Sequence, residues 1–194
     1  MEAFLRILLY LTPVWITPNG LTWTRLAAVP ILLALYAFNP FWALMPYVWG
    51  CFTDWYDGEL ARRRGLMTPE GKLLDERVDK AFIYGTMVPL VASDTVAFGA
   101  SWVFWGLVFI LFRDALVVGM RMRWPAKALR IPSLPSAKWK TFILMLGLGS
   151  LLVAHPSIMG SWYFSLIGSV FVYVAVGLAV WSGGHYAWLF VRTK

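Results

Sequence analysis

Charged residues are scarce in this chain. Only 14% of its 194 residues are Asp, Glu, Lys or Arg, whereas about a quarter of the residues in a soluble domain are charged. The mean hydropathy is +0.67, and long apolar stretches recur from one end of the chain to the other. This composition excludes an ordinary soluble domain. It predicts an all-α integral membrane protein with one domain over residues 1–194.

Cysteine is scarce, and the N-terminal segment is not expected to be a cleavable leader. Cys51 is the single cysteine, so no intramolecular disulfide can form, and its apolar neighbours predict a buried small residue. The apolar segment 1–12 has no small-residue cleavage site and is too short to span about 30 Å of hydrocarbon. We therefore expect residues 1–17 to form an amphipathic juxtamembrane helix at the membrane interface.

Apolar segments of spanning length follow and predict a bundle of six transmembrane helices within residues 18–190. Their expected ranges are 21–38, 41–62, 72–92, 99–121, 137–154 and 161–190.

Lys and Arg are missing from every second connection between these segments. None occurs in 39–41, 93–98 or 155–160, although the chain has 17 basic residues. The positive-inside rule then places both termini, and the connection between the second and third segments, on the cytoplasmic side of a bacterial-type inner membrane or its organellar equivalent. Cytoplasmic loops and anionic lipid explain the net charge of +7, so we expect no nucleic-acid partner.

Acidic residues number only ten, yet four aspartates lie within one run of 26 residues. The run reads D-x2-D-G-x2-A-R-x8-G-x3-D-x3-D, and its fixed positions are Asp54, Asp57, Gly58, Ala61, Arg62, Gly71, Asp75 and Asp79. Four carboxylates in an apolar chain require compensating positive charge, which is most simply a pair of divalent cations.

Helical geometry predicts that these aspartates converge. At about 100° per residue, Asp54 and Asp57 fall on one stripe of their helix, beside two small residues of the run that leave space for a ligand. Asp75 and Asp79 share a face of the next helix, which a short connector makes an antiparallel neighbour. Oxygen-only ligands favour Mg²⁺ or Mn²⁺, and two such metals can polarise a phosphoryl group. The spacing does not fit an EF-hand loop.

The run matches every fixed position of the signature of the CDP-alcohol phosphotransferase family, which the chain resembles over nearly its whole length. The resemblance implies a homodimeric, six-span membrane enzyme that uses two divalent metals to displace CMP from a CDP-linked lipid. It implies that Asp54, Asp57, Asp75 and Asp79 hold the metals. It also implies that Asp79 is the general base for the acceptor hydroxyl.

The resemblance also implies contacts with the CDP moiety. Residues 18–25 are similar to the P-N-x-L-T-x-x-R segment that leads into the first span of this family. The implied CDP contacts are Asn19, Thr22, Gly58, Ala61, Arg62 and Gly71. Arg62 would face phosphate, whereas for Asn19 and Thr22 helix N-capping is the alternative.

A second basic set lies at the adjoining ends of the fourth and fifth segments. An arginine inside an apolar run is costly unless it meets an anion. The adjacent Asp114 could be a partial partner of Arg113, but it points about 100° away round a helix. We therefore predict an acceptor-phosphate pocket, with snorkelling to the cytoplasmic surface as the alternative. Its residues would be Arg113, Arg121, Lys138 and Lys140.

The acceptor follows from resemblance within the family. R-[DE]-x6-R followed by K-x-K-T is similar to the phosphatidylglycerophosphate synthases, which implies CDP-diacylglycerol and glycerol 3-phosphate as substrates. Asp114 departs from the usual Glu of that group, and an Arg-Asp pair also occurs in cardiolipin synthases, which accept phosphatidylglycerol. Inositol phosphates are a further alternative. A cation transporter is a remote one, because it would need polar groups along a whole span.

Overall fold

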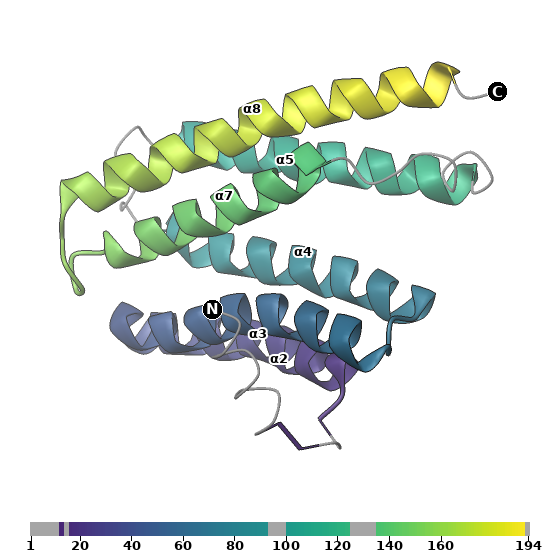
Figure 1. The fold of residues 1–194 in the computed structure, drawn as a ribbon. Coiled ribbons are helices and arrows are strands. Elements are labelled where there is room, and N and C mark those ends of the chain that lie inside the picture. The colour runs from purple at the N-terminus through teal and green to yellow at the C-terminus, as the bar shows by residue number, and fades with distance from the viewer. Residues whose placement is uncertain (1–11, 14–15, 93–99, 125–134, 193–194) are drawn as a thin grey trace. The chain divides into compact units, whose positions relative to one another are not determined.

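A computed structural model describes residues 12, 13, 16–92, 100–124 and 135–192. This part of the chain contains six helices and no strand, which confirms the all-α class (Figure 1). The helices are α2 (Pro18–Phe38), α3 (Pro40–Arg64), α4 (Pro69–Ala92), α5 (Ala100–Arg123), α7 (Pro135–Val153) and α8 (Trp162–Arg192). Each of the six predicted segments falls on one of these helices.

The described helices differ in how well they suit a membrane. Three contain a stretch that is long and apolar enough to cross one, namely α2, α5 over Val103–Met120, and α8. A shorter apolar helix, Trp139–Val153, lies within α7, while α3 and α4 carry the aspartates. These findings agree with an integral membrane protein, and six transmembrane spans stay a prediction.

Local signals fix the ends of α2 and α3. The hydroxyl of Thr17 caps α2 by accepting a hydrogen bond from the Gly20 amide at 3.1 Å, and Pro18 occupies the first turn. Asn39 ends α2 and starts α3, because its side-chain oxygen accepts from the Phe41 amide at 3.0 Å. The two helices therefore form a hairpin with a very short connection. The predicted capping by Asn19 or Thr22 is wrong, since Thr17 caps the helix.

The chain forms two compact units, and the first, which ends at Pro89, contains α2, α3 and most of α4. Tight packing joins α3 to α4: a Cβ atom on Gly50 would lie 2.2 Å from the ring of Phe82. Tyr47 of α3 stacks on the same ring, with a centroid separation of 5.7 Å. At its other end α3 stops at Gly65, whose φ of 65° favours glycine. These contacts fix the helix faces that carry the aspartates.

The segment before α2 is held by an arginine at the end of α3. Arg64 donates hydrogen bonds to the carbonyl oxygens of Ile16 at 2.9 Å and Thr12 at 2.8 Å. The Thr12 hydroxyl also contacts the Tyr56 hydroxyl. Thr12, Pro13, Ile16 and Thr17 are not helical, so the predicted helix over 1–17 does not extend to these positions, and residues 1–11 lie outside the described part.

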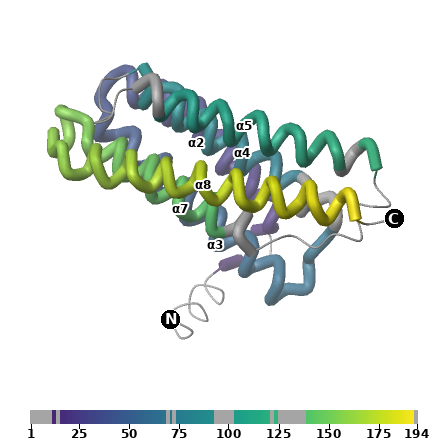
Figure 2. Tube along the Cα trace, turned by 90° about the horizontal axis from the view of Figure 1, so that it is seen from above, coloured from purple at the N-terminus to yellow at the C-terminus, as the bar shows by residue number. Residues whose placement is uncertain are grey.

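The second unit begins at Leu90 and contains α5, α7 and α8. Figure 2 shows α7 and α8 running side by side. They cross closely where two glycines meet: a Cβ atom on Gly168 would lie 2.9 Å from the Gly147 carbonyl oxygen and 2.7 Å from Leu151 Cγ. Small residues at a crossing let two helix backbones approach, as is common between membrane helices.

We expect Gly168→Ala to lower the melting temperature of the purified protein in detergent by roughly 5 °C, because the added methyl group meets a backbone oxygen. Gly177→Ala is the matched control on the same helix, since no described atom lies within 4 Å of its would-be Cβ. Its melting temperature should stay level or rise slightly. Equal melting temperatures for the two variants would contradict the close crossing.

Candidate functional site

The first two aspartates of the signature lie on the face of α3 that points into the first unit. Asp57 is buried, with only 3% of its surface exposed, and the side chain of Asp54 is 34% exposed. On α4, Asp75 is more open, with a side-chain exposure of 44%, and Asp79 follows one turn later. Helical spacing thus places one acidic pair on each of two neighbouring helices.

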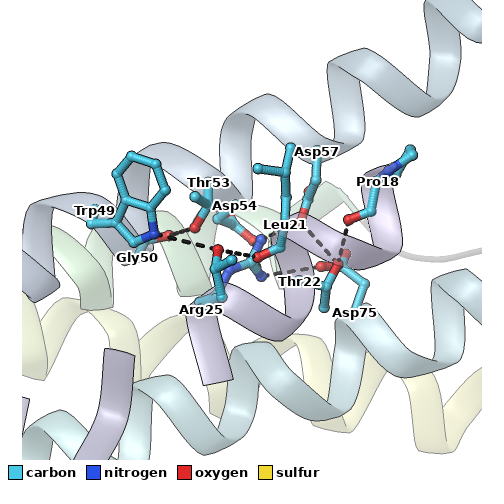
Figure 3. A network of polar contacts seen from close by, with 11 residues as sticks. Pro18, Leu21, Thr22, Arg25, Trp49, Gly50, Thr53, Asp54, Asp57 and Asp75 are labelled. Carbon is cyan, nitrogen blue, oxygen red and sulfur yellow. Dashed lines mark hydrogen bonds and ion pairs between the residues drawn. The ribbon is translucent and has the colours of Figure 1, made fainter. Parts of the chain in front are cut away.

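A buried arginine on α2 brings three of these carboxylates together. Arg25 Nη1 lies 2.8 Å from an oxygen of Asp54 and 3.1 Å from one of Asp75, while Nη2 lies 2.6 Å from Asp57 Oδ2. Figure 3 shows the guanidinium between the three labelled aspartates. Asp79 also interacts electrostatically with Arg25. Three of the four aspartates that were predicted to converge, Asp54, Asp57 and Asp75, therefore meet at an arginine.

Thr22 lies one turn before Arg25 on the same face of α2 and is also buried. Its hydroxyl is 3.1 Å from Asp57 Oδ2 and 3.1 Å from the Pro18 carbonyl oxygen. Oδ2 of Asp57 is thus held by two side chains of α2. This contact gives Thr22 a role in positioning Asp57, in addition to the predicted contact with CDP, which stays a prediction.

The possible metal ligands of this cluster are all carboxylate oxygens, which hard divalent cations prefer. When all four aspartates are ionised, as metal ligands would be, their charge exceeds the single positive charge of Arg25 by three. No three His, Cys, Asp or Glu side chains of the described residues lie close enough together to form a finished metal site. The guanidinium lies between the carboxylates, so binding of a metal requires them to rearrange around it.

Two of the implied nucleotide contacts, Asn19 and Gly71, meet at the starts of α2 and α4. A Cβ atom on Gly71 would lie 2.9 Å from Asn19 Oδ1, so a larger residue here would have to displace the Asn19 side chain. At Gly58 the only described atom near a would-be Cβ is Arg62 Nη1, at 3.7 Å. Packing therefore does not explain Gly58, and its predicted contact with CDP stays a prediction. Ala61 is half-buried one turn later.

Arg62 is held by a carboxylate that sequence reasoning overlooked. Its side chain is 59% exposed and donates to Glu59 through Nε at 3.1 Å and Nη2 at 2.8 Å. Glu59 also accepts a hydrogen bond from Arg63 Nε at 2.6 Å. An anionic ligand at Arg62 therefore has to share the guanidinium with Glu59.

A second charged cluster lies in the second unit and contains two of the four predicted phosphate-binding cations. Lys140 Nζ of α7 donates to both oxygens of Asp114 at 2.8 Å, and Arg113 Nη1 donates to the same carboxylate at 2.9 Å. Nη2 of Arg113 donates to Ser182 of α8 at 2.8 Å. Asp114 is thus a partner of Arg113, as its adjacent position allowed, although the two Cα–Cβ directions differ by about 100° round the helix.

This cluster keeps a surplus of positive charge. Arg113 and Lys140 carry two positive charges and Asp114 one negative charge, which leaves one for an anion. A Cβ atom on Gly183 would lie 3.1 Å from Arg113 Nε, so α8 seats the arginine closely. The side chains of Arg121 and Lys138, the other two predicted cations, lie outside the described residues.

Arg25 is the main residue that sequence reasoning missed as part of the site. A signal was present, because Arg25 is the single charged residue of the apolar helix α2 and the last fixed position of the P-N-x-L-T-x-x-R segment. A lone arginine in a membrane span requires an anionic partner. The four signature aspartates are the largest group of acidic residues that could be this anionic partner.

Comparison with known proteins identifies close similarities. A family model described as CDP-alcohol phosphatidyltransferase matches residues 15–181. A CDP-diacylglycerol–glycerol-3-phosphate 3-phosphatidyltransferase of Rickettsia bellii is 31% identical over 87% of this chain and 92% of its own length. A protein of the same name from Pseudomonas fluorescens is 32% identical over 91% and 92%. A rice cardiolipin synthase (CMP-forming) is 28% identical over 85% of this chain and 54% of its own length.

We expect Thr22→Val to lower the melting temperature by roughly 5 °C, because it removes a buried donor from Asp57 and keeps the side-chain shape. Thr24→Val is the matched control, since Thr24 is exposed on the same helix. In an Asp57→Asn background the effect of Thr22→Val should shrink to less than half. An unchanged effect in that background would contradict the contact.

Proposed function

This chain belongs to the CDP-alcohol phosphatidyltransferase family, and from this premise we propose that it transfers a phosphatidyl group from CDP-diacylglycerol to glycerol 3-phosphate. The products are phosphatidylglycerophosphate and CMP. As a member of this family, the chain is a transferase of substituted phosphate groups that acts in phospholipid biosynthesis. The observation that carries the proposal is the gathering of Asp54, Asp57 and Asp75 of the signature round one point in the first unit.

The four aspartates are the residues that would hold two divalent cations, Mg²⁺ or Mn²⁺. Bound there, such cations would polarise the phosphoryl group and neutralise charge on the attacking and leaving oxygens. The surplus of three negative charges over Arg25 supports this assignment.

Asp79 acts as the general base in this proposal. The acceptor hydroxyl gives its proton to the Asp79 carboxylate, and its oxygen attacks the phosphorus nearest the diacylglycerol. A new P–O bond forms to the acceptor as the P–O bond to CMP breaks. The negative charge that leaves on the CMP phosphate faces Arg62, so positioning and electrostatics supply the catalysis.

The nucleotide lies along the ends of α2, α3 and α4 in this proposal. Asn19 and Gly71 meet at two of these ends, and Gly58 offers an open approach to the α3 backbone. Thr22 and Ala61 complete the set implied by the family signature. The Glu59–Arg62 pair then competes with the CDP phosphates for the same guanidinium.

Arg113 and Lys140 are the cations that we assign to the acceptor phosphate, together with Arg121 and Lys138. Their surplus positive charge over Asp114 supports binding of an anion. Arg113 presents a fork that Ser182 and Asp114 hold from two sides, which preorganises it for a phosphate group.

The alternative to the proposed reaction is the same phosphatidyl transfer to a different acceptor. The similarity to a cardiolipin synthase supports a second candidate, in which phosphatidylglycerol is the acceptor, and an inositol phosphate would use the same chemistry. The family is one of transferases, so a cation transporter is not retained.

We further propose that the chain has six transmembrane spans and forms a homodimer. We place both termini and the site on the cytoplasmic side, because the distribution of Lys and Arg indicates this orientation.

Asp79→Asn should lower the rate of CMP release from CDP-diacylglycerol at least about 100-fold in the presence of Mg²⁺, because the base loses its charge. Glu76→Gln is the matched control on the same helix, since Glu76 pairs with Lys80 at 2.9 Å, and its rate should stay near that of the unaltered protein. Wild-type turnover in Asp79→Asn would show that the catalytic assignment is wrong.

Among glycerol 3-phosphate, phosphatidylglycerol and inositol phosphate, only glycerol 3-phosphate should yield a lipid product. Arg113→Met should raise KM for it roughly tenfold or more, because one charge-assisted hydrogen bond is lost, and should leave KM for CDP-diacylglycerol unchanged. Arg192→Met is the control, since Arg192 lies over the Trp188 ring at 4.1 Å. Product from phosphatidylglycerol alone would replace the proposal by cardiolipin synthesis.

A further inference from the structure

We propose that the Arg25 guanidinium is the built-in counterion of the aspartate cluster and holds Asp54, Asp57 and Asp75 together before any divalent cation binds. The inference rests on the proposed function in one respect, namely that these aspartates bind divalent cations. Arg25 is a positioning residue here, because it acts on the substrates only through the carboxylates.

The burial of Arg25 excludes a surface role. None of its side chain is exposed, and it is the largest fully buried side chain in the described residues. A snorkelling arginine would reach the polar surface, and an arginine that binds substrate phosphate would be accessible from the site. An arginine at this depth is stable only because anions surround it.

The geometry of the contacts matches a role in holding the helices. The guanidinium extends from α2 and bonds to two aspartates of α3 and one of α4, at 2.6–3.1 Å. A planar fork with several donors can bridge three carboxylates, whereas a single ammonium group cannot do so with the same geometry. Thr22 adds a second hydrogen bond from α2 to Asp57. One side chain thereby joins all three helices of the first unit.

The charge balance gives this arrangement a testable consequence. Without Arg25 the cluster would be carboxylates alone, and it could form only when cations or protons neutralise them. With Arg25, part of the charge is neutralised within the chain, so the fold of the first unit does not depend on metal. The three remaining negative charges keep the cluster receptive to cations.

The experiment compares melting temperatures of the purified full chain in detergent, with EDTA and with millimolar Mg²⁺. The unaltered protein should melt within a few degrees in the two conditions. Arg25→Met should melt roughly 10 °C lower in EDTA, because buried carboxylates lose their counterion, and Mg²⁺ should restore at least half of that loss.

Arg64→Met is the matched control, since Arg64 is a partly buried arginine of the same unit that binds carbonyl oxygens and no carboxylate of the cluster. Its loss of stability should be the same with EDTA and with Mg²⁺. The proposal is overturned if Arg25→Met matches the unaltered protein in EDTA. It is also overturned if the unaltered protein itself needs Mg²⁺ to fold.

A double variant keeps the test decisive if Arg25→Met does not fold. Replacing Asp57 by Asn in the Arg25→Met background removes the most buried of the unpaired charges, so the double variant should be more stable in EDTA than Arg25→Met alone. A double variant that is no more stable would show that Arg25 contributes packing and not charge.

The two proposals fail in different ways. If the proposed function is wrong, the unaltered protein shows no metal-dependent release of CMP from CDP-diacylglycerol, and the comparison of Arg25→Met with the double variant in EDTA still tests the counterion. If the counterion inference alone is wrong, CMP release is normal in the unaltered protein and the stabilities of the variants show no coupling between Arg25 and Asp57.

Discussion

The ion cluster of Arg25 with the signature aspartates is the interaction on which the first unit depends. A cation buried in an apolar helix is unstable by itself, and so are several ionised carboxylates gathered at one point. Each group removes the electrostatic penalty of the other. Because the three carboxylates come from α3 and α4 and the guanidinium from α2, the same contacts also fix how these helices pack.

The second unit also contains an ion cluster whose charges are only partly compensated, but its remaining charge is positive. Asp114 lies between Arg113 and Lys140, so one buried acid pairs with a buried lysine and a partly buried arginine and leaves positive charge over. The aspartate cluster keeps an excess of negative charge that suits cations. The Asp114 cluster keeps an excess of positive charge that suits a phosphate group. In both, compensation is partial, which leaves each cluster with the sign of charge that its proposed ligand requires.

Much of the fold and part of the site could be predicted from the residues. Apolar segments of spanning length located all six described helices, and the spacing of Asp54, Asp57, Asp75 and Asp79 indicated that they share two helix faces. The partners of these residues were harder to predict. Arg25 and Asp54 are far apart in the sequence, and the local pattern predicts Thr22 only as a helix cap or a nucleotide contact. The sequence indicated the Arg113–Asp114 pair only as a partial one, since helical phase places Cα atoms and not the ends of long side chains.

The residues alone were enough to indicate the family, because the signature aspartates, their small neighbours and Arg62 match every fixed position of its signature, and the family model covers residues 15–181. The sequence also determined the helices, since hydrophobic length is a local property. Only the tertiary structure decided which charge meets which. It placed Arg25 among the aspartates and Asp114 between two bases, because ion pairing depends on distances across helices that no local spacing contains.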